Sequence, residues 1–249
     1  MLAVLSLVFW AFLATTSIVL FPIAVMLWAL TSPIDPRRRW LHQFTCFWAS
    51  LYTWLNPAWP VQIHGREKID RNATYVMVAN HQSLLDILVF FRIFVHFKWV
   101  SKVENFKIPF IGWNMRLNRY IELKRGDKAS IVQMLRACRE TLAAGNSIMM
   151  FPEGTRSADG RLRRFKLGAF ELAKDAKMPI LPLVITGTAK ALPKRGFVLR
   201  GHHPISIHVL DPIPYESFAD QTVDETCERV RNLIAAEIQK HTPADSAAA

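Results

Sequence analysis

The stretch Tyr75-Val76-Met77-Val78-Ala79-Asn80-His81-Gln82-Ser83-Leu84-Leu85-Asp86 passes from an apolar run through a polar turn into a second apolar segment. The first run has the length and composition of a buried strand. A run of the same kind, Ser147 to Phe151, leads into Pro152-Glu153-Gly154-Thr155-Arg156-Ser157. Beyond Pro57, such runs alternate with amphipathic helical patterns, as in parallel βαβ units. The sequence therefore predicts an α/β fold with a largely parallel central sheet flanked by helices.

Seven strands and two long helices are expected in this body of the chain. The clearest helix begins near Asp127 and ends before Gly145, a natural C-cap, and the last helix carries Val223 to Ile238 on its apolar face. Open α/β sheets bind ligands beyond the carboxyl ends of their strands, so His81 and Glu153 are expected to share one cleft. The expected strands are residues 61–64, 75–78, 98–100, 120–123, 147–151, 180–185 and 205–209.

The N-terminal segment is expected to lie in lipid. No Asp, Glu, Lys or Arg occurs from Met1 to Ser32, and this apolar run exceeds the roughly 20 residues that cross a hydrocarbon core. A cleaved signal peptide is the alternative, but the run lacks a basic leading region and a small-x-small cleavage site. All 31 Lys and Arg lie beyond Pro36, beginning with Arg37-Arg38-Arg39. The positive-inside rule therefore predicts that the body of the protein lies on the cytoplasmic side, as in a protein of the inner membrane.

A second, aromatic-rich helix is expected over residues 40–55, before Asn56-Pro57 interrupts the pattern. Two arrangements stay open: a true membrane span, or two helices that lie in one leaflet with aromatic side chains at headgroup depth. A further alternative is that residues 40–55 form an ordinary core helix. We expect a membrane anchor at 1–57, a catalytic domain at 58–241 and a disordered tail at 242–249. The apolar residues of the second helix recur every three or four positions: Trp40, Phe44, Phe47, Trp48, Leu51 and Leu55.

The formal net charge of +11 indicates an anionic partner. Because the chain combines a long apolar segment with no recognisable nucleic-acid motif, membrane lipids are the expected partner and nucleic acid is not. Many of these cations could also be ordinary solvated surface. The three cysteines, Cys46, Cys138 and Cys227, lie within helical patterns and have no metal-ligand spacing, so reduced and buried thiols are expected.

His81 and Asp86 form the first candidate site. On one continuous helix they would lie about 140° apart and could not pair. If the helix begins near Ser83, His81 can fold back so that Asp86 accepts its ring N–H, which leaves the other nitrogen as a general base. The alternative is that Ser83-x-x-Asp86 is a capping-box-like sequence in which the carboxylate binds only backbone amides.

The second candidate site is an anion-binding loop after the 147–151 strand. Gly154 permits close approach of the backbone, Thr155 offers a hydroxyl, and Arg156 presents a fork that matches phosphate oxygens. Glu153 would order a neighbouring arginine or contact a substrate hydroxyl. Arg125 and Lys102, which follow two other expected strands, could add positive charge to the same cleft, although a solvated basic surface is the alternative for all of these cations.

Several mechanisms are disfavoured because their motifs are missing. The sequence has no G-x-S-x-G elbow, no Walker loop, no G-x-G-x-x-G and no zinc spacing among its eight histidines. Because no cysteine or serine stands in an evident nucleophile setting, direct transfer is favoured over a covalent enzyme intermediate. Neither a metal nor a bound cofactor is expected.

Asn80-His81-x4-Asp86 and Phe151-Pro152-Glu153-Gly154-Thr155-Arg156-Ser157, in this order, together resemble the glycerolipid acyltransferase family, in particular bacterial 1-acyl-sn-glycerol-3-phosphate acyltransferases. The resemblance covers roughly residues 60–215, and the N-terminal apolar pair is similar to that family's two-helix membrane motif. One departure is Asn118 to Arg125, where the family has a Gly-led apolar run ending in Arg.

The resemblance implies that His81, supported by Asp86, deprotonates the free hydroxyl of lysophosphatidic acid, which then attacks the thioester of acyl-CoA or acyl-carrier protein. It also implies that Arg156, Arg125 and Lys102 hold the acceptor phosphate, with Glu153, Gly154 and Thr155 shaping the site. A lyso-ornithine lipid or another lysophospholipid is an alternative acceptor, and a non-catalytic protein that binds anionic lipid is an alternative function.

Overall fold

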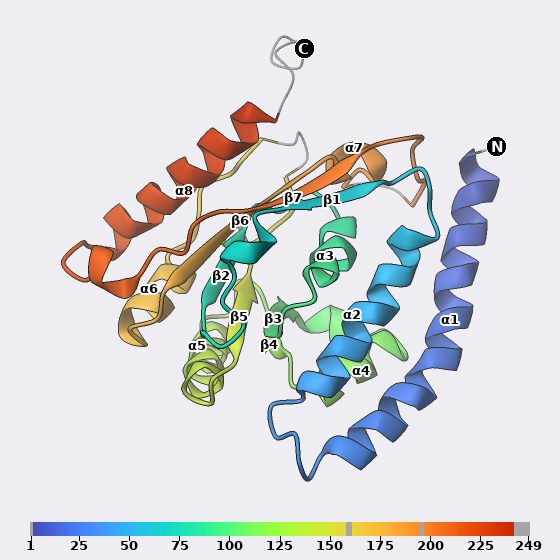
Figure 1. Ribbon diagram of the computed structural model, residues 1–249, viewed down its shortest axis with the longest axis horizontal. Coiled ribbons are helices and arrows are strands. Elements are labelled where there is room, and N and C mark those ends of the chain that lie inside the picture. Colours follow the sequence, from blue (N-terminus) through green and yellow to red (C-terminus); the bar gives the residue numbers. More distant parts are fainter. Residues whose placement is uncertain (1, 158–160, 195–196, 242–249) are drawn as a thin grey trace.

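The computed structural model describes residues 2–157, 161–194 and 197–241. Its centre is one sheet of seven strands in the order β1-β7-β6-β2-β5-β3-β4 (Figure 1). All neighbouring strands run parallel except β6 and β7, which are antiparallel, so the predicted largely parallel sheet is confirmed. The strands are β1 (Val61–His64), β2 (Val76–Ala79), β3 (Phe97–Lys102), β4 (Ile121–Leu123), β5 (Ser147–Met150), β6 (Ile180–Thr186) and β7 (Ile205–Val209).

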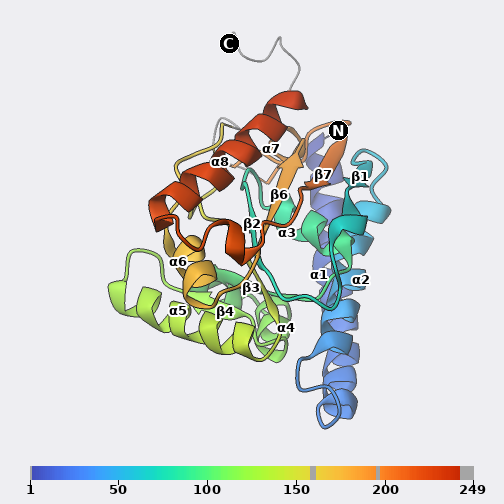
Figure 2. The same ribbon diagram turned by 60° about the vertical axis from the view of Figure 1, so that its left-hand side comes forward.

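Helices cover both faces of this sheet. Helices α1 to α4 lie on one face and α5, α6 and α8 on the other (Figures 1 and 2). The helices are α1 (Leu2–Thr31), α2 (Arg39–Trp54), α3 (Leu85–Phe90), α4 (Ile111–Leu117), α5 (Lys128–Ala143), α6 (Gly168–Asp175), α7 (Thr188–Ala191) and α8 (Val223–Lys240). Short 3-10 turns lie at Arg66–Lys68, Phe91–Ile93, Val103–Lys107 and Tyr215–Ser217.

Side-chain alternation along the central strands builds the two cores. In β2, Met77 and Ala79 join the cluster under α2 and α3, whereas Val76 and Val78 join the cluster under α5, α6 and α8. All four residues are fully buried, as a strand covered on both faces requires. The continuous apolar run that predicted this strand is thus explained by its two covered faces.

Local sequence signals set the helix boundaries. Asp127 caps α5 by accepting a hydrogen bond from the Ser130 backbone N–H at 3.1 Å, and Gly145 follows that helix with φ of +73°. Thr222 and Glu225 form a reciprocal capping box at the start of α8. The short helices α4 and α7, which sequence periodicity did not predict, are too brief to show a clear repeat.

The N-terminal helix α1 is long and apolar enough to cross a membrane, judged by length and composition. One side of it packs along the body. Thr16 Oγ1 lies 2.9 Å from Tyr52 Oη of α2, and the indole Nε1 of Trp10 donates to Phe197 O at 2.7 Å. The opposite side exposes large apolar side chains from Leu2 to Leu30. Contiguous exposed apolar surface of this kind indicates contact with lipid or protein.

Helix α2 buries a side that carries Leu41, Trp48 and Tyr52 as well as small and polar residues, and leaves Trp40 and Trp54 about half exposed or more. Within the predicted apolar stripe, Trp40, Phe47 and Leu55 are exposed, whereas Trp48 is buried. The helix therefore packs in the core on one side, and contact of its exposed side with lipid stays a prediction. The proposed boundary at residue 57 stays a prediction, and the predicted disordered tail, 242–249, lies outside the described residues.

Candidate active site

Five parallel strands end at the same edge of the sheet, and the candidate residues follow them. The order β6-β2-β5-β3-β4 brings together the chain segments that begin at Gly187, Asn80, Phe151, Val103 and Lys124. Three of these segments are tied directly to one another. The Asn80 amide side chain bridges from the end of β2 to β6, donating to Ile185 O and accepting from Ile185 N, both at 2.8 Å.

His81 and Asp86 form the expected pair. His81 Nδ1 lies 2.8 Å from Asp86 Oδ2, and the two side chains are 7% and 0% exposed. A carboxylate can only accept, so Nδ1 carries the proton and Nε2 is the unprotonated nitrogen. Within the described chain, Nε2 has no hydrogen-bond partner. The imidazole also stacks on the Phe151 ring at 4.0 Å between centroids, with 8° between the planes. This geometry is compatible with the expected general base, and the role of His81 stays a prediction.

The same carboxylate also binds backbone amides, which is part of what the capping alternative predicted, although α3 has no side-chain cap. Asp86 Oδ2 accepts hydrogen bonds from the backbone N–H groups of Gln82, at 2.6 Å, and Ser83, at 2.8 Å. Helix α3 begins at Leu85, so His81 lies in the preceding turn as the pairing requires. The two interpretations of the spacing were not exclusive, because one oxygen caps the turn and holds the imidazole.

Thr188, a residue that the sequence gave no reason to select, completes the environment of Asp86. Its Oγ1 donates to Asp86 Oδ1 at 2.5 Å, and it is fully buried at the start of α7. Gly187, before it, has φ of +88°, and a Cβ there would lie 2.1 Å from Pro204 O. Only glycine fits this turn, which places the threonine hydroxyl under the carboxylate.

Glu153 holds the two sequence blocks together. Its Oε1 accepts from His81 N at 2.6 Å, and its Oε2 accepts from Arg163 N at 3.1 Å. In addition, Ser157 N donates to His81 O at 2.8 Å. Burial raises the pKa of Glu153 to about 7, and the charge of Asp86 contributes less to this rise. The hydrogen bonds from His81 N and Arg163 N lower the pKa but do not offset the burial. Glu153 therefore connects the backbone at His81 with the backbone at Arg163, and its two expected roles, to order a neighbouring arginine or to contact a substrate hydroxyl, stay predictions.

The remaining loop residues lie beside this contact. Gly154 has φ of +69°, and a Cβ there would lie 2.8 Å from Lys166 Cε and 3.0 Å from its Nζ. Lys166 also donates its backbone N–H to Pro152 O at 2.9 Å. The lysine side chain thus covers Gly154. Thr155 and Arg156, the next residues of the loop, are partly exposed.

The expected phosphate-binding cations lie at or after the ends of β3, β4 and β5. Burial lowers the pKa of Arg125, the charge of Arg156 lowers it further, and Glu104 acts in the opposite direction. Lys102 forms an ion pair with Glu104 at 3.0 Å, with both side chains about half exposed. Lys102, Arg125 and Arg156 thus belong to three neighbouring strand ends, in the order β5-β3-β4. Their assignment to a substrate stays a prediction.

Elsewhere, the described residues contain one group of metal-ligand type, formed by His208, Glu237 and His241. Their ligand atoms lie within 4.8 Å of one another on β7 and at the end of α8. Glu237 also accepts from Lys240 Nζ at 2.8 Å. Sequence spacing did not reveal this group because the two histidines are 33 residues apart. It takes no part in the strand ends that carry His81.

The family model for acyltransferases matches residues 60–186, from the start of the sheet to the end of β6. The chain belongs to the acyltransferase family. Similar proteins include 1-acyl-sn-glycerol-3-phosphate acyltransferases of Brassica napus (chloroplastic BAT2) and Chlamydomonas reinhardtii. The Brassica protein is 38% identical over an alignment that covers 80% of this chain and 56% of the relative. The Chlamydomonas protein is 35% identical over an alignment that covers 92% of this chain and 67% of the relative. This acyltransferase thus spans little more than half the length of the Brassica protein.

The fold of this acyltransferase is also found in a solved structure. The crystal structure of the 1-acyl-sn-glycerophosphate acyltransferase PlsC from Thermotoga maritima superposes with a TM-score of 0.77, covering 96% of this chain and 97% of that one at 23% identity. Such a likeness confirms the predicted fold class, including helices ahead of the sheet.

Proposed function

We propose that this acyltransferase moves a fatty acyl group from an acyl thioester to the free sn-2 hydroxyl of 1-acyl-sn-glycerol-3-phosphate, giving phosphatidic acid. The observation that carries the proposal is the buried His81–Asp86 hydrogen bond of 2.8 Å, fixed by Glu153 to a loop of cations. The names of the relatives support this acceptor.

The proposed reaction begins with the acceptor hydroxyl at His81 Nε2. That nitrogen takes the hydroxyl proton, and Asp86 stabilises the resulting imidazolium through Nδ1–H. The acceptor oxygen forms a bond to the thioester carbonyl carbon, and collapse of the tetrahedral intermediate breaks the carbon–sulfur bond. The leaving thiolate takes the proton back from His81. Positioned base catalysis contributes about 10²–10⁴ in rate, and charge stabilisation and orientation supply the rest.

The cations have the second role in this proposal. Arg125 and Arg156, with Lys102 and Lys166 beside them, would bind the phosphate of the acceptor, since guanidinium groups form paired hydrogen bonds to phosphate oxygens. Burial and then the charge of Arg156 lower the pKa of Arg125 in the free protein, and phosphate binding would offset the repulsion from Arg156. Acyl-CoA or acyl-carrier protein would be the co-substrate, with no bound cofactor or metal.

We further propose that α1 and α2 lie in one leaflet of the inner membrane with the sheet on its cytoplasmic side. Contacts with the body extend along α1 from Ser6, which accepts from Leu199 N at 2.9 Å, to Trp28, whose ring lies 5.8 Å from the guanidinium carbon of Arg38. A helix surrounded by lipid on all sides could not keep these contacts. The exposed sides of α1 and α2 would together face the acyl chains.

The proposal is tested with full-length protein in detergent, labelled acyl-CoA or acyl-carrier protein, and a panel of lysolipids. His81→Ala and Asp86→Asn are expected to abolish transfer, whereas His202→Ala, at an exposed histidine, serves as the matched control. Transfer that survives His81→Ala would exclude the mechanism. Turnover of a lyso-ornithine lipid or another lysophospholipid, but not of lysophosphatidic acid, would exclude the acceptor and keep the mechanism.

A further inference from the structure

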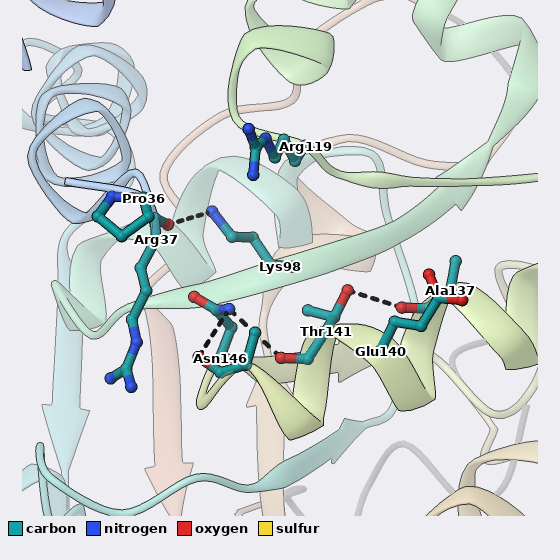
Figure 3. A pocket seen from close by; sticks show the side chains of 9 residues that line it. Pro36, Arg37, Lys98, Arg119, Ala137, Glu140, Thr141 and Asn146 are labelled. Carbon is teal, nitrogen blue, oxygen red and sulfur yellow. Dashed lines mark hydrogen bonds between the residues drawn. The ribbon is translucent and has the colours of Figure 1, made fainter. Parts of the chain in front are cut away.

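A second positively charged site lies at the opposite edge of the sheet from His81. A cavity of about 400 Å³ opens there where β3 and β5 begin and α5 ends, and Arg37, Lys98 and Arg119 line it together with Glu140, Thr141 and Asn146 (Figure 3). Strand β3 connects the two edges, with Lys98 at one end and Lys102 at the other. Four residues of strand span about 13 Å, so this cavity is separate from the candidate active site.

The lysine in this cavity is almost completely buried and incompletely paired. Lys98 is 2% exposed, and its ammonium donates to Arg37 O at 2.8 Å and to Asn118 O at 2.9 Å. An ammonium has three N–H donors, so one has no acceptor among the residues that the structure describes. Buried charges are normally paired, and this one has only neutral carbonyl partners. Burial lowers the pKa of Lys98 to about 7. The charge of Asp35 acts in the opposite direction, and Arg119 and Arg38 add to the lowering.

The arginines of the cavity also lack acidic partners. Across the described ranges, neither Arg37 nor Arg119 has a carboxylate oxygen within 4.0 Å. Glu140, the acid in the lining, already pairs with Arg136 at 3.0 Å and is exposed. Asp35, the buried acid nearby, accepts a hydrogen bond from Trp40 N at 2.9 Å. Three cations therefore line one cavity, and Asp35, the acid whose charge acts on Lys98, forms no ion pair with it among the described residues.

A neighbouring arginine shows the same lack of an anion. Arg38 is 7% exposed, and its Nε has no hydrogen-bond partner in the described part of the chain. Asp35 raises the pKa of Arg38, while burial and the charge of Arg119 lower it. Burial and repulsion thus disfavour positive charge in this region, and an anion in the cavity would offset both.

We propose that this cavity is a second anion site, which binds a phosphate group through Arg37, Arg119 and Lys98. The cavity is large enough for a phosphate and its first waters. Arg37 and Arg119 offer planar forks for its oxygens, and Lys98 offers its free N–H. Because Pro36 and Arg37 follow closely after the apolar helix α1, the site lies where the lipid-facing surface ends, and the phosphate could come from an anionic lipid headgroup or from solution.

Calorimetric titration of the full chain in neutral detergent tests the site. The background is Arg125→Gln with Arg156→Gln, which removes the proposed acceptor site, so that failure of one site does not imply failure of the other. Inorganic phosphate at constant ionic strength is one arm. Micelles containing phosphatidylglycerol, compared with phosphatidylcholine, are the second arm. Binding in the first arm identifies soluble phosphate as a source, and binding in the second identifies a lipid headgroup.

In this background, Arg37→Gln and Arg119→Gln are each expected to weaken binding about tenfold, the effect of one lost charged contact. Both side chains are exposed, so neither change opens the core, and a thermal melt verifies folding. Arg229→Gln, which removes the same charge from an exposed position on α8, is expected to leave binding unchanged. Absence of binding in both arms, or equal weakening by Arg229→Gln, would overturn the proposal.

Discussion

Replacing Thr188 separates two explanations for how Asp86 is held. Thr188 Oγ1 is the sole hydrogen-bond donor recorded to Asp86 Oδ1 among the described residues, at 2.5 Å, while Oδ2 accepts from His81, Gln82 and Ser83. Thr188→Val keeps the shape of the side chain and removes the hydroxyl. Thr188→Ser keeps the hydroxyl and removes one methyl group. Comparing the two variants therefore separates loss of the hydrogen bond from loss of packing at one fully buried position.

The loss of the hydrogen bond and the loss of the methyl group differ in their cost in free energy. A hydrogen bond to a buried charged group is worth about 1.5–3 kcal/mol, and an acceptor left unsatisfied keeps its desolvation cost. One buried methyl group is worth about 0.8–1.5 kcal/mol. If the hydrogen bond dominates, the melting temperature in detergent is lower for Thr188→Val than for Thr188→Ser. The turnover number should follow the same order, because a carboxylate that loses one anchor holds the His81 imidazole less firmly.

The loss in turnover has an upper limit. If the whole 1.5–3 kcal/mol were lost from the transition state, the rate would fall about 10- to 150-fold. Thr188→Ser should retain most of the activity. The reverse order of melting temperatures, with Thr188→Ser the less stable variant and Thr188→Val fully active, would refute the reasoning and show that Thr188 only fills space.

Three further changes test other parts of the molecule. Glu153→Gln should lose one of two backbone hydrogen bonds, about 1.5–3 kcal/mol, and should lower turnover, measured by melting and initial rates. Gly154→Ala should cost more stability and activity than Gly126→Ala. Both have positive φ, which costs about 1–2 kcal/mol, but an added Cβ meets Lys166 only at Gly154. The pKa of Lys98 is about 7 in the folded chain and 10.5 ordinarily. Between pH 7 and pH 10.5 the unfolded state therefore binds more protons than the folded state. The free energy of unfolding then rises with pH, by at most about 1.4 kcal/mol per pH unit. Lys98→Met should flatten that rise in a pH series of melts, and an unchanged slope would contradict it.

Sequence alone predicted the features that depend on local pattern. The runs at 61–64 and 205–209 are strands with the expected bounds, and the other expected strands agree to within two residues at each end. The contact between His81 and Asp86 was also predictable, because five residues fit a turn followed by a helix. Hydrophobic runs and short turns are local properties, and the sequence states them directly.

Features that depend on distant contacts were not predictable in the same way. Thr188 lies 102 residues from Asp86, and a threonine after a glycine carries no local signal of that contact. The stripe on α2 was recognised, but periodicity does not say which medium a stripe faces. Trp40 and Trp54 face outward because the small side chains of the same helix, such as Ala49 and Ser50, pack against the body.

The geometry of the candidate base depends on three neighbouring strands. His81 follows β2, and Asn80 ties that strand end to β6 at Ile185. Thr188, after β6, binds the carboxylate partner of His81, and Glu153, after β5, binds its backbone N–H. Each bond crosses to an adjacent parallel strand, so the imidazole is held only when β5, β2 and β6 are in register. A variant that loosens β6 against β2, even far from His81, should therefore lower turnover before it lowers the helix content of the protein.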